Sequence, residues 1–462
     1  GVLGAAARSY AMVSERAAKV PRLSGPASLD CSAARELSCG AAQEASVAAQ
    51  RPTTANLHDG DAVAHGQPLP SAFADNVPTW DAQILRFLLR FLSAESLSVP
   101  VIINGGYVRD LLLGKQPEDL DISICLRNCP EHVTVGGLLA RLPAFAAAHA
   151  ELGVREVKIA TILSNESKDK KLDTFKGHFT DQDGRKVEVD VMPTIGAETY
   201  EEGNRIPVRD QRGTPEQDAL RRDLTIGAML LQVVADAASG SGLAYTLFDF
   251  YGGLADLRQG ILRAPCPHDS LEVVRATVLR REDDQRIARA LKLDTLPQAE
   301  CVQVLWWAKI LMDDPLRICR ALRFSAKLKF LLHDAFWQAA PFALEALRSK
   351  VAGGRKSVEY LKICGYGLEA GTQFFELAFE RTFGPDNALR LAPALFGGQD
   401  GKGKVRAMPD VRSSDSELFC ALVPELAALS EPAMLTGTLL ATAIFSADFG
   451  PNSAGAAKLF QN

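Results

Sequence analysis

The segment NGGYVRDLLLGKQPEDLDISI at residues 104–124 restricts the fold more than any other part of the chain. Its end, which continues as DLDISICL (119–126), alternates polar and apolar residues, the pattern of a strand with one buried face. Because side chains on a strand repeat every two residues, we expect Asp119 and Asp121 on the same face. The preceding run VPVIING (99–105) predicts another short strand, which ends in glycines. The chain is therefore expected to build a small sheet that displays two neighbouring carboxylates.

The residues between these strands suggest what the carboxylates do. Gly105 and Gly106 allow the backbone to approach a ligand closely, and a helix starting at 107–108 would direct its N-terminal amides toward a triphosphate. Arg109 adds a guanidinium fork for phosphate oxygens. Two carboxylates on one strand face can hold Mg²⁺, which prefers oxygen ligands. An isolated DxD is more often a solvated strand end, so the interpretation depends on the glycines beside it.

Length and composition set wider limits. A chain of 462 residues with 47% hydrophobic and 23% charged residues fits a soluble globular protein of two to four domains. The net charge of -5 gives no global sign of a nucleic-acid partner, so any such partner must be held by a local basic surface. The nine cysteines show no zinc-site spacing and are expected to be reduced thiols in an intracellular compartment. No apolar run reaches the length of a membrane span.

The first 75 residues differ in composition from the rest. They are rich in Ala, Ser, Gly and Pro and show little periodicity, which predicts a disordered leader. The start is poor in acidic residues and contains Arg and Ser, as organellar transit peptides do. A leader without an address fits equally well, so the mitochondrial, plastid and cytoplasmic or nuclear alternatives stay open.

Further along the chain, the pattern predicts both strands and helices. DAQILRFLLRFLSAES (81–96) has helical spacing, whereas 154–163 and 185–193 are expected to be strands joined by a polar loop at 164–184. From Thr214 onward we expect helices. Thr214 suits an N-cap, Pro215 suits the first helical position, and acidic residues follow in the first turn.

Five stretches together resemble one family. GGYVRDLLLGKQPEDLDISI is similar to the signature of class II tRNA nucleotidyltransferases, the CCA-adding enzymes, which share a head with bacterial poly(A) polymerases. In the second stretch, which is the first of those given next, the segments RIP and GTP resemble the eukaryotic type. Four further motifs follow in the family's order: RIPVRDQRGTPEQDALRRDLTIGAM (205–229), FDFYGGLADLRQGILRAP (248–265), DDPLRICRALRFSAKLKF (313–330) and, more faintly, GGRKSVEYLK (353–362).

The resemblance covers roughly residues 99–365 and implies a fold. The class is α+β, with a polymerase-β-like nucleotidyltransferase head that contains a small mixed sheet, followed by an all-α neck, body and shortened tail. The expected division of the chain is a leader at 1–75, the head at 76–235, a helical neck with a nucleobase-templating helix at 236–345, and an RNA-binding helical body and tail at 346–462.

The resemblance also implies roles for residues of the head. Asp119 and Asp121 would hold the catalytic Mg²⁺ ions. The triphosphate would contact a set of three residues, namely Gly105, Gly106 and Arg109. Arg222 would contact the nucleotide, and Asp223 is a candidate to accept the ribose 2′-hydroxyl. The segment around Arg222 could otherwise be an exposed helix face with ion pairs. Either Asp190 or Glu188 could add a third acid.

The fourth motif is expected to choose the nucleobase. Asp314 and Arg317 lie three apart, so we expect them on one helix face, where a carboxylate and a guanidinium can imitate a base edge. Cytosine and adenine each present an exocyclic amine beside a ring nitrogen, which such a pair fits. Arg320 and Arg323 continue the face toward the nucleotide. The alternative is a basic stripe that binds RNA phosphates.

The chain departs from the family pattern at several positions. Gly227 stands where the family usually has Asn, which could weaken catalysis. The link at 266–309 is longer than usual and contains a charged segment that is expected to be an inserted helix. The tail is short and slightly acidic, which is unexpected for a segment that grips tRNA.

The implied activity is addition of CCA to tRNA 3′ ends from CTP and ATP, with Mg²⁺ as cofactor and tRNA as partner. Two alternatives remain open at this stage. The first is a CC-adding, A-adding or poly(A) polymerase of the same family, and the polar loop at 164–184 favours full CCA addition over these. The second is an RNA-binding protein with weakened catalysis, against which the carboxylates and arginines of the motifs argue.

Overall fold

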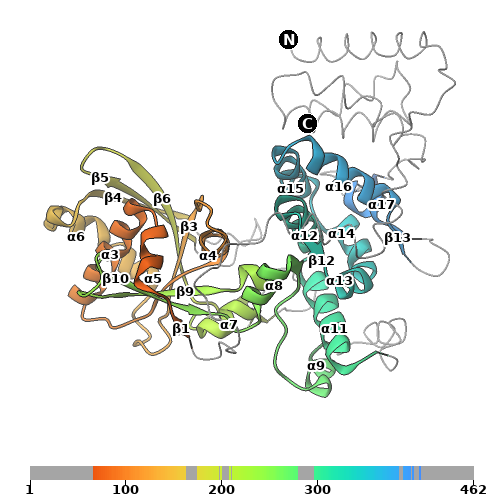
Figure 1. The fold of residues 1–462 in the computed structure, drawn as a ribbon, viewed down its shortest axis with the longest axis horizontal. Helices are drawn as coiled ribbons and strands as arrows, with labels where there is room; N and C mark the ends of the chain where they lie inside the picture. Colours follow the sequence, from red (N-terminus) through yellow and green to blue (C-terminus); the bar gives the residue numbers. More distant parts are fainter. Residues whose placement is uncertain are drawn as a thin grey trace, which may run out of the picture.

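The computed structural model describes residues 66–162, 174–196, 198–199, 208–209, 211–278, 296–383, 389–396, 398–399 and 405–406. Figure 1 shows two parts: a sheet with its helices on one side, and a group of helices on the other. We refer to the sheet part, residues 66–262, as the head, and to α9 and the elements after it as the helical region. The fold class predicted from the sequence, a mixed-sheet head followed by helices, is confirmed.

The head is built on one eight-stranded sheet. The strand order is β1-β10-β9-β2-β3-β6-β5-β4, and β3 and β6 are parallel whereas the other pairs are antiparallel. In that order the strands are β1 (Gln67–Pro68), β10 (Leu243–Phe248), β9 (Leu230–Ala235), β2 (Val101–Ile103), β3 (Leu120–Ile124), β6 (Lys186–Pro193), β5 (Thr174–Asp181) and β4 (Val154–Ile162).

Short helices connect and cover these strands. They include η3 (Ser71–Asn76), α3 (Thr79–Ala94), α4 (Gly105–Leu112), α5 (Val135–Leu139), α6 (Leu142–Ala148), η4 (Ala150–Leu152), α7 (Pro215–Leu220), η6 (Thr225–Gly227) and α8 (Gly253–Gln259). The two-residue strands β7 (Glu198–Thr199) and β8 (Val208–Arg209) form a separate pair.

The helical region contains α9 (Leu271–Val278), α11 (Gln298–Asp313), α12 (Leu316–Leu328), α13 (Asp334–Ala339), η8 (Ala340–Ala343), α14 (Leu344–Lys350), α15 (Gly353–Gly365), α16 (Leu368–Glu380) and α17 (Leu391–Phe396). Three two-stranded pairs accompany them. They are β11 (Ile261–Leu262) with β12 (Leu331–Leu332), β13 (Thr382–Phe383) with β14 (Leu389–Arg390), and β15 (Gly398–Gln399) with β16 (Val405–Arg406).

Several predicted elements are confirmed. The helix expected at 81–96 is α3, and the expected strands are β2, β3, β4 and β6. The start of α7 is as predicted, with Thr214 as the N-cap. The Thr214 hydroxyl accepts from the Gln217 amide, and the Gln217 side-chain oxygen accepts from the Thr214 amide. Such a capping box satisfies two amides that the helix cannot pair internally.

Two expectations about secondary structure are wrong. The chain is not uniformly helical after Thr214, because 230–235 and 243–248 form the central strands β9 and β10. A continuous apolar run such as LLQVVA fits a buried strand as well as a buried helix, and only its pairing partners decide between them. The polar loop predicted at 164–184 is also shorter, since 174–181 form β5; residues 163–173 lie outside the described residues.

The predicted division into domains stays a prediction. The sheet continues past residue 235, because β10 pairs with β9. Near the start, 67–68 pair with β10 and 71–76 form a 3-10 helix, whereas residues 1–65 of the predicted leader lie outside the described residues. The charged segment at 279–295 and most of the predicted tail lie outside them too.

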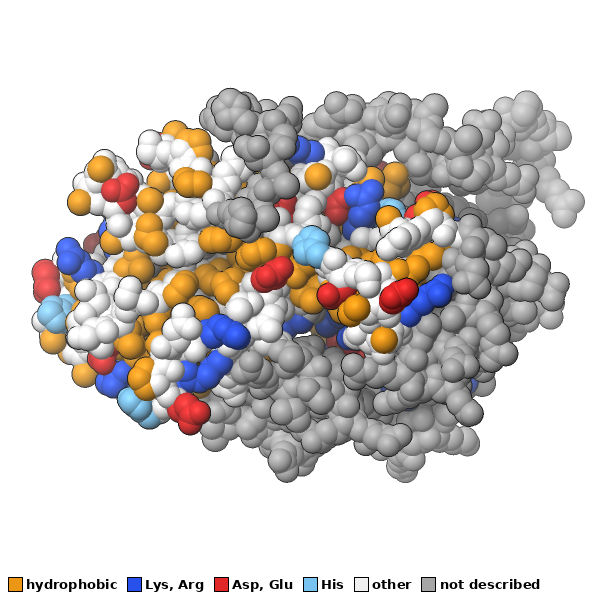
Figure 2. Space-filling model, turned by 90° about the horizontal axis from the view of Figure 1, so that it is seen from below, with side chains coloured by type: hydrophobic (Ala, Val, Ile, Leu, Met, Phe, Trp, Pro, Cys, Tyr) orange, Lys and Arg blue, Asp and Glu red, His pale blue; other side chains and the backbone are white. Residues whose placement is uncertain are grey.

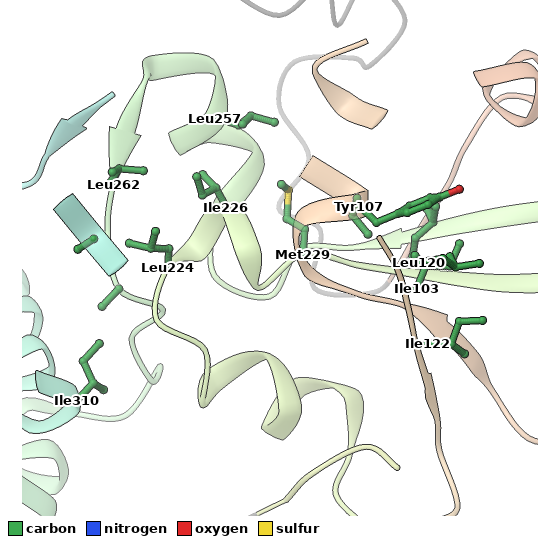
Figure 3. Packing of buried hydrophobic residues seen from close by; sticks show 14 of the residues in the cluster. Ile103, Tyr107, Leu120, Ile122, Leu224, Ile226, Met229, Leu257, Leu262 and Ile310 are labelled. Atoms are coloured by element: carbon green, nitrogen blue, oxygen red, sulfur yellow. The ribbon is translucent and has the colours of Figure 1, made fainter. Parts of the chain in front are cut away.

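One hydrophobic cluster joins the head to the helical region. Figure 3 shows buried side chains that run from the sheet, at Ile103 and Ile122, through Met229 and Ile226 to Ile310 of α11. All five are at most 2% exposed. Each buried side chain of this size stabilises the fold by about 1.5–3 kcal/mol relative to its exposure to water. The two parts are therefore packed against each other by a shared core.

The described residues on one face of the molecule form a surface of mixed charge. On the face drawn in Figure 2, Lys and Arg side chains of the described residues are interspersed with Asp and Glu and with hydrophobic groups. Among the described residues, no helix is both long and apolar enough to cross a bilayer.

The close packing of α8 on η6 generates a prediction about glycine. A Cβ on Gly253 would lie 2.4 Å from the Thr225 carbonyl oxygen and 2.9 Å from Met229 Cγ, whereas a Cβ on Gly227 would meet no atom within 4 Å. We expect Gly253→Ala to lower the free energy of unfolding by about 1–3 kcal/mol because the backbone must move. Gly227→Ala is the matched control and should change it by less than about 0.5 kcal/mol. Thermal unfolding of both variants tests this, and equal melting temperatures would contradict the packing described.

Candidate active site

The turn between β2 and α4 brings the backbone next to two charged side chains. Gly105, the first residue of α4, has φ of +65°, a conformation that glycine adopts without strain. A Cβ at this position would lie 3.3 Å from Arg222 Nη1 and 3.9 Å from Asp121 Oδ2. The helix therefore begins at Gly105, two residues before the predicted start at Tyr107, and lies beside a carboxylate and a guanidinium.

The parallel pairing of β3 and β6 brings together two carboxylates. Asp121 on β3 is directly opposite Asp190 on β6. Leu120 and Ile122 face the core at 3% and 1% exposure, so Asp121 must point to the other side of the sheet. Asp119 precedes β3 and is exposed. The alternation that the sequence predicted is thus present, with Asp190 as an additional neighbour.

The proximity of these acids changes the ionisation of Asp121. Burial raises the pKa of Asp121 to about 6, and the negative charges of Asp190 and Asp119 add to the rise. Arg222 and Lys176 act in the opposite direction. Both the burial and the neighbouring negative charges disfavour the ionised carboxylate, and a bound cation would offset them.

Lys176 distinguishes the two candidates for a third acid. It lies opposite Asp190 on the adjacent strand β5, and its Nζ is 3.1 Å from Asp190 Oδ1. The same ammonium group pairs with Glu188, whose side chain is half exposed and which lies two residues before Asp190 on β6. Asp190 is the acid that neighbours Asp121, so of the two alternatives the geometry favours Asp190.

Arg222 is positioned by a buried carboxylate on α7. Its Nη2 lies 2.8 Å from Asp218 Oδ2, and Arg221 Nε lies 2.8 Å from Asp218 Oδ1. Asp218 is fully buried and also accepts from the Ile195 amide. Burial would raise the pKa of Asp218, but the two arginines outweigh it and lower that pKa. The sequence interpretation missed Asp218, although its i,i+3 and i,i+4 spacing to the arginines was a usable signal.

Asp223 is joined to α12 of the helical region. Arg320 Nε donates to Asp223 Oδ2 over 2.5 Å. Although burial would raise the pKa of Asp223, Arg320 and then Arg317 hold it at about 2. The segment of Arg221 to Asp223 is therefore a contact between the two parts of the molecule rather than the exposed ion-paired helix face considered from the sequence.

The expected arrangement of Asp314 and Arg317 on one helix face is wrong. Asp314 ends α11 in an extended conformation, and its Oδ1 accepts from the amide of Leu316, the first residue of α12. Pro315 explains the break, because its ring restricts the residue before it to extended backbone. The two side chains still lie near one another, since Asp314 immediately precedes the helix that carries Arg317. Arg317 Nη2 donates to the Arg221 carbonyl over 3.0 Å.

Two of the predicted nucleotide-binding arginines are held in buried ion pairs. Arg109 donates to Asp110 through Nε and Nη2, at 2.8 and 2.9 Å, and is 4% exposed. Arg323 donates to Glu359 of α15 over 2.6 Å and is 7% exposed. Their contact with a nucleotide stays a prediction. The Arg323 pair joins α12 to α15, whereas the Arg109 pair lies within α4.

The mixed sheet of the head, followed by helices, fits the polymerase-β-like nucleotidyltransferase fold. Residues 101–263 match the family model described as the poly(A) polymerase head domain. Through this head, the chain is similar to CCA tRNA nucleotidyltransferases and poly(A) polymerases.

Individual relatives are similar over the same part. The chain is 32% identical over 265 residues to the mitochondrial CCA tRNA nucleotidyltransferase of Candida glabrata. The aligned residues cover 56% of this chain and 38% of that protein. It is 28% identical over 270 residues to poly(A) polymerase I of Escherichia coli O157:H7, covering 57% and 42%. The chain thus spans about two fifths of the length of these relatives. A solved CCA-adding enzyme in its apo form II superposes with a TM-score of 0.45 at 18% identity, covering 86% of each chain.

The raised pKa of Asp121 generates a stability prediction for the metal-free protein. The ionised carboxylate destabilises the fold above pH 6, so Asp121→Asn should raise the free energy of unfolding at pH 8 by about 1–2 kcal/mol. The native protein binds more protons than the unfolded chain between about pH 4 and 6, so this advantage should shrink as the pH falls through that window.

Thermal melts in EDTA at pH 8 and pH 4.5 measure the effect. Asp183→Asn, a change at an exposed carboxylate in the β5–β6 turn, is the control and should not alter the midpoint. A melting temperature for Asp121→Asn at or below that of the wild type at pH 8 would show that the ionised Asp121 carboxylate does not destabilise the fold.

Proposed function

We propose that this chain is a tRNA nucleotidyltransferase that adds C and A to tRNA 3′ ends from CTP and ATP, without a nucleic-acid template, and releases pyrophosphate. The observation that supports it most directly is the row of Asp121 and Asp190 beside the Gly105 turn and Arg222. The names of the relatives, CCA tRNA nucleotidyltransferases among them, point to the same reaction.

The carboxylates fit Mg²⁺ as the cofactor. Among the described residues, no three His, Cys, Asp or Glu side chains form a metal cage. This agrees with the habit of Mg²⁺, which is usually held by one or two carboxylates together with waters and substrate phosphates. Asp119 and Asp121 would hold the ion, with Asp190 next to them. When bound, Mg²⁺ polarises the attacking hydroxyl and stabilises the charge on the departing pyrophosphate.

Residues of the head would bind and orient the triphosphate. The first amides of α4 have no carbonyl partner within the helix and attract phosphate oxygens. Arg222 Nε is buried and has no hydrogen-bond partner among the described residues, so it remains available to a phosphate oxygen. Asp218 holds the rest of that guanidinium in place. The RNA 3′-hydroxyl then attacks the α-phosphate, and pyrophosphate leaves.

Base choice would come from the junction of α11 and α12. The Arg317 guanidinium can donate to a ring nitrogen, and the Asp314 carboxylate can accept from an exocyclic amine, a pattern shared by cytosine and adenine. Uracil and guanine would present mismatched groups to this pair. Arg355 of α15 lies 3.7 Å from Asp314 Oδ2, so the carboxylate is already held from a second helix.

Partial addition and polyadenylation are the competing activities. Poly(A) polymerase I and an A-adding tRNA nucleotidyltransferase are also among the relatives, at 28% and 24% identity. A catalytically weakened RNA-binding protein is the remaining candidate, but the acids and Arg222 at the site argue against it. Gly227 leaves open space where the family's Asn stands and does not distort the turn.

The addition reaction tests this proposal. Incubating the protein with Mg²⁺, labelled nucleotides and tRNA that ends at its discriminator base should yield C, C and A and then stop. Long A tails or a halt after CC would support the competing activities. RNA binding without incorporation would support the weakened protein.

Asp121→Ala should reduce incorporation by at least about a thousandfold, because the substitution removes a group that holds the reacting metal. The variant should keep its fold, as circular dichroism can verify. Asp183→Ala, outside the site, should retain wild-type rates. Substantial activity in Asp121→Ala would refute the assignment of this carboxylate.

Arg317→Ala should blur nucleotide choice more than it slows transfer. The ratio of kcat/KM for CTP over UTP is expected to fall by about tenfold or more, because one donor to the base is lost. Arg348→Ala, which removes an exposed ion pair of α14, is the control. An unchanged CTP-to-UTP ratio in Arg317→Ala would show that this guanidinium does not select the base.

A further inference from the structure

The ion pair of Asp223 and Arg320 crosses from the head to the helical region. The Asp223 side chain is 13% exposed and that of Arg320 is 38% exposed, so neither partner is fully enclosed by the protein. A charge-assisted bond of 2.5 Å restricts the carboxylate to one orientation. The resemblance assigned both residues separately to the nucleotide, whereas the structure joins them to each other.

Only one carboxylate oxygen takes part in this bond. Arg320 donates to Oδ2. A carboxylate has a second oxygen with its own lone pairs, and Oδ1 can accept a hydroxyl group while Oδ2 stays paired. The low pKa of Asp223 keeps the group ionised at neutral pH, when it is purely an acceptor.

Neighbouring residues of α12 support the position of Arg320. Its guanidinium carbon lies 5.9 Å from the centre of the Phe324 ring, which stands one turn farther along the helix. One turn earlier, Arg317 donates to the carbonyl of Arg221. The helix that carries the proposed base-reading arginine is thus fastened to the 221–223 segment at two points. Base recognition and the carboxylate of Asp223 are set by the same helix.

We propose that Arg320 is a positioning residue for ribose recognition: it fixes the Asp223 carboxylate so that Oδ1 accepts the 2′-hydroxyl of an incoming ribonucleoside triphosphate. Arg320 does not touch the substrate in this role. Fixing the carboxylate would favour ribonucleotides over deoxyribonucleotides. A carboxylate that is free to rotate would form a weaker hydrogen bond with the 2′-hydroxyl. This inference rests on the proposed function of the site.

The test compares ribo- and deoxyribonucleotide use by three variants. Arg320→Met removes the bond but keeps the length of the side chain, and Arg320→Lys keeps the charge without the planar fork. Lys327→Met is the matched control, since Lys327 makes another ion pair between α12 and the head, at 3.7 Å to Glu118, without reaching Asp223. For each, kcat/KM is measured for CTP and dCTP, and for ATP and dATP, on tRNA lacking CCA.

Arg320→Met is expected to lower the ratio of ribo to deoxy kcat/KM by about tenfold or more, with the loss concentrated in the ribonucleotide. Arg320→Lys should fall between it and the wild type, and Lys327→Met should keep the wild-type ratio. Equal slowing of CTP and dCTP would overturn the inference, because it would mean that Arg320 merely docks the helix. If Arg320→Met does not fold, Arg320→Lys decides alone by the same ratio.

A binding measurement separates this inference from the proposed function. Calorimetric titration of ATP and dATP reports ribose preference without turnover. A wild-type protein that adds no nucleotide would defeat the proposed function, whereas a preference for ATP that persists in Arg320→Met would defeat only the role of Arg320. A wild-type protein that binds ATP and dATP equally and uses them equally would also overturn the inference.

Discussion

The site depends on two like charges being held together. Parallel pairing of β3 and β6 places Asp121 opposite Asp190, and the Gly105 turn brings the start of a helix to the same spot. Burial raises the pKa of Asp121, and the negative charge of Asp190 raises it further. The fold sustains that cost because Ile122 and its neighbours on the opposite face of the strand are buried in the core. A carboxylate with a perturbed pKa at such a place is the observation on which the proposed cation site rests.

The second constraint is the junction between the head and the helical region. A shared hydrophobic cluster joins the two, from Ile103 to Ile310, and arginines of α12 reach back to the 221–223 segment. Because the packing is continuous, a residue on α12 can be aligned with a residue on α7 without a separate domain closure. The groups proposed to contact base, ribose and phosphate are thereby positioned by elements that share one core.

The local pattern of the candidate site residues was easier to predict from the sequence than the sheet. Asp119, Asp121 and the glycines follow from strand alternation and from glycine's backbone freedom, which are local properties. The strands β5, β9 and β10 were missed, because an apolar run such as LLQVVA or a mixed segment such as TFKGHFTD takes its conformation from its neighbours in the sheet. The break between Asp314 and Arg317 was missed although Pro315 signals it, since the expected motif was assigned to one continuous helix.

The chain by itself determined which residues can do chemistry and how they are spaced along each element. Alternation, capping at Thr214 and the glycine pair are set by neighbouring residues, so they can be deduced from the sequence. Only the tertiary structure decided which charges meet: that Asp190 rather than Glu188 stands beside Asp121, that Asp218 holds Arg222, and that Arg320 binds Asp223. Those partners are up to 97 residues apart in the chain, and strand register and helix packing, which are non-local, bring them together.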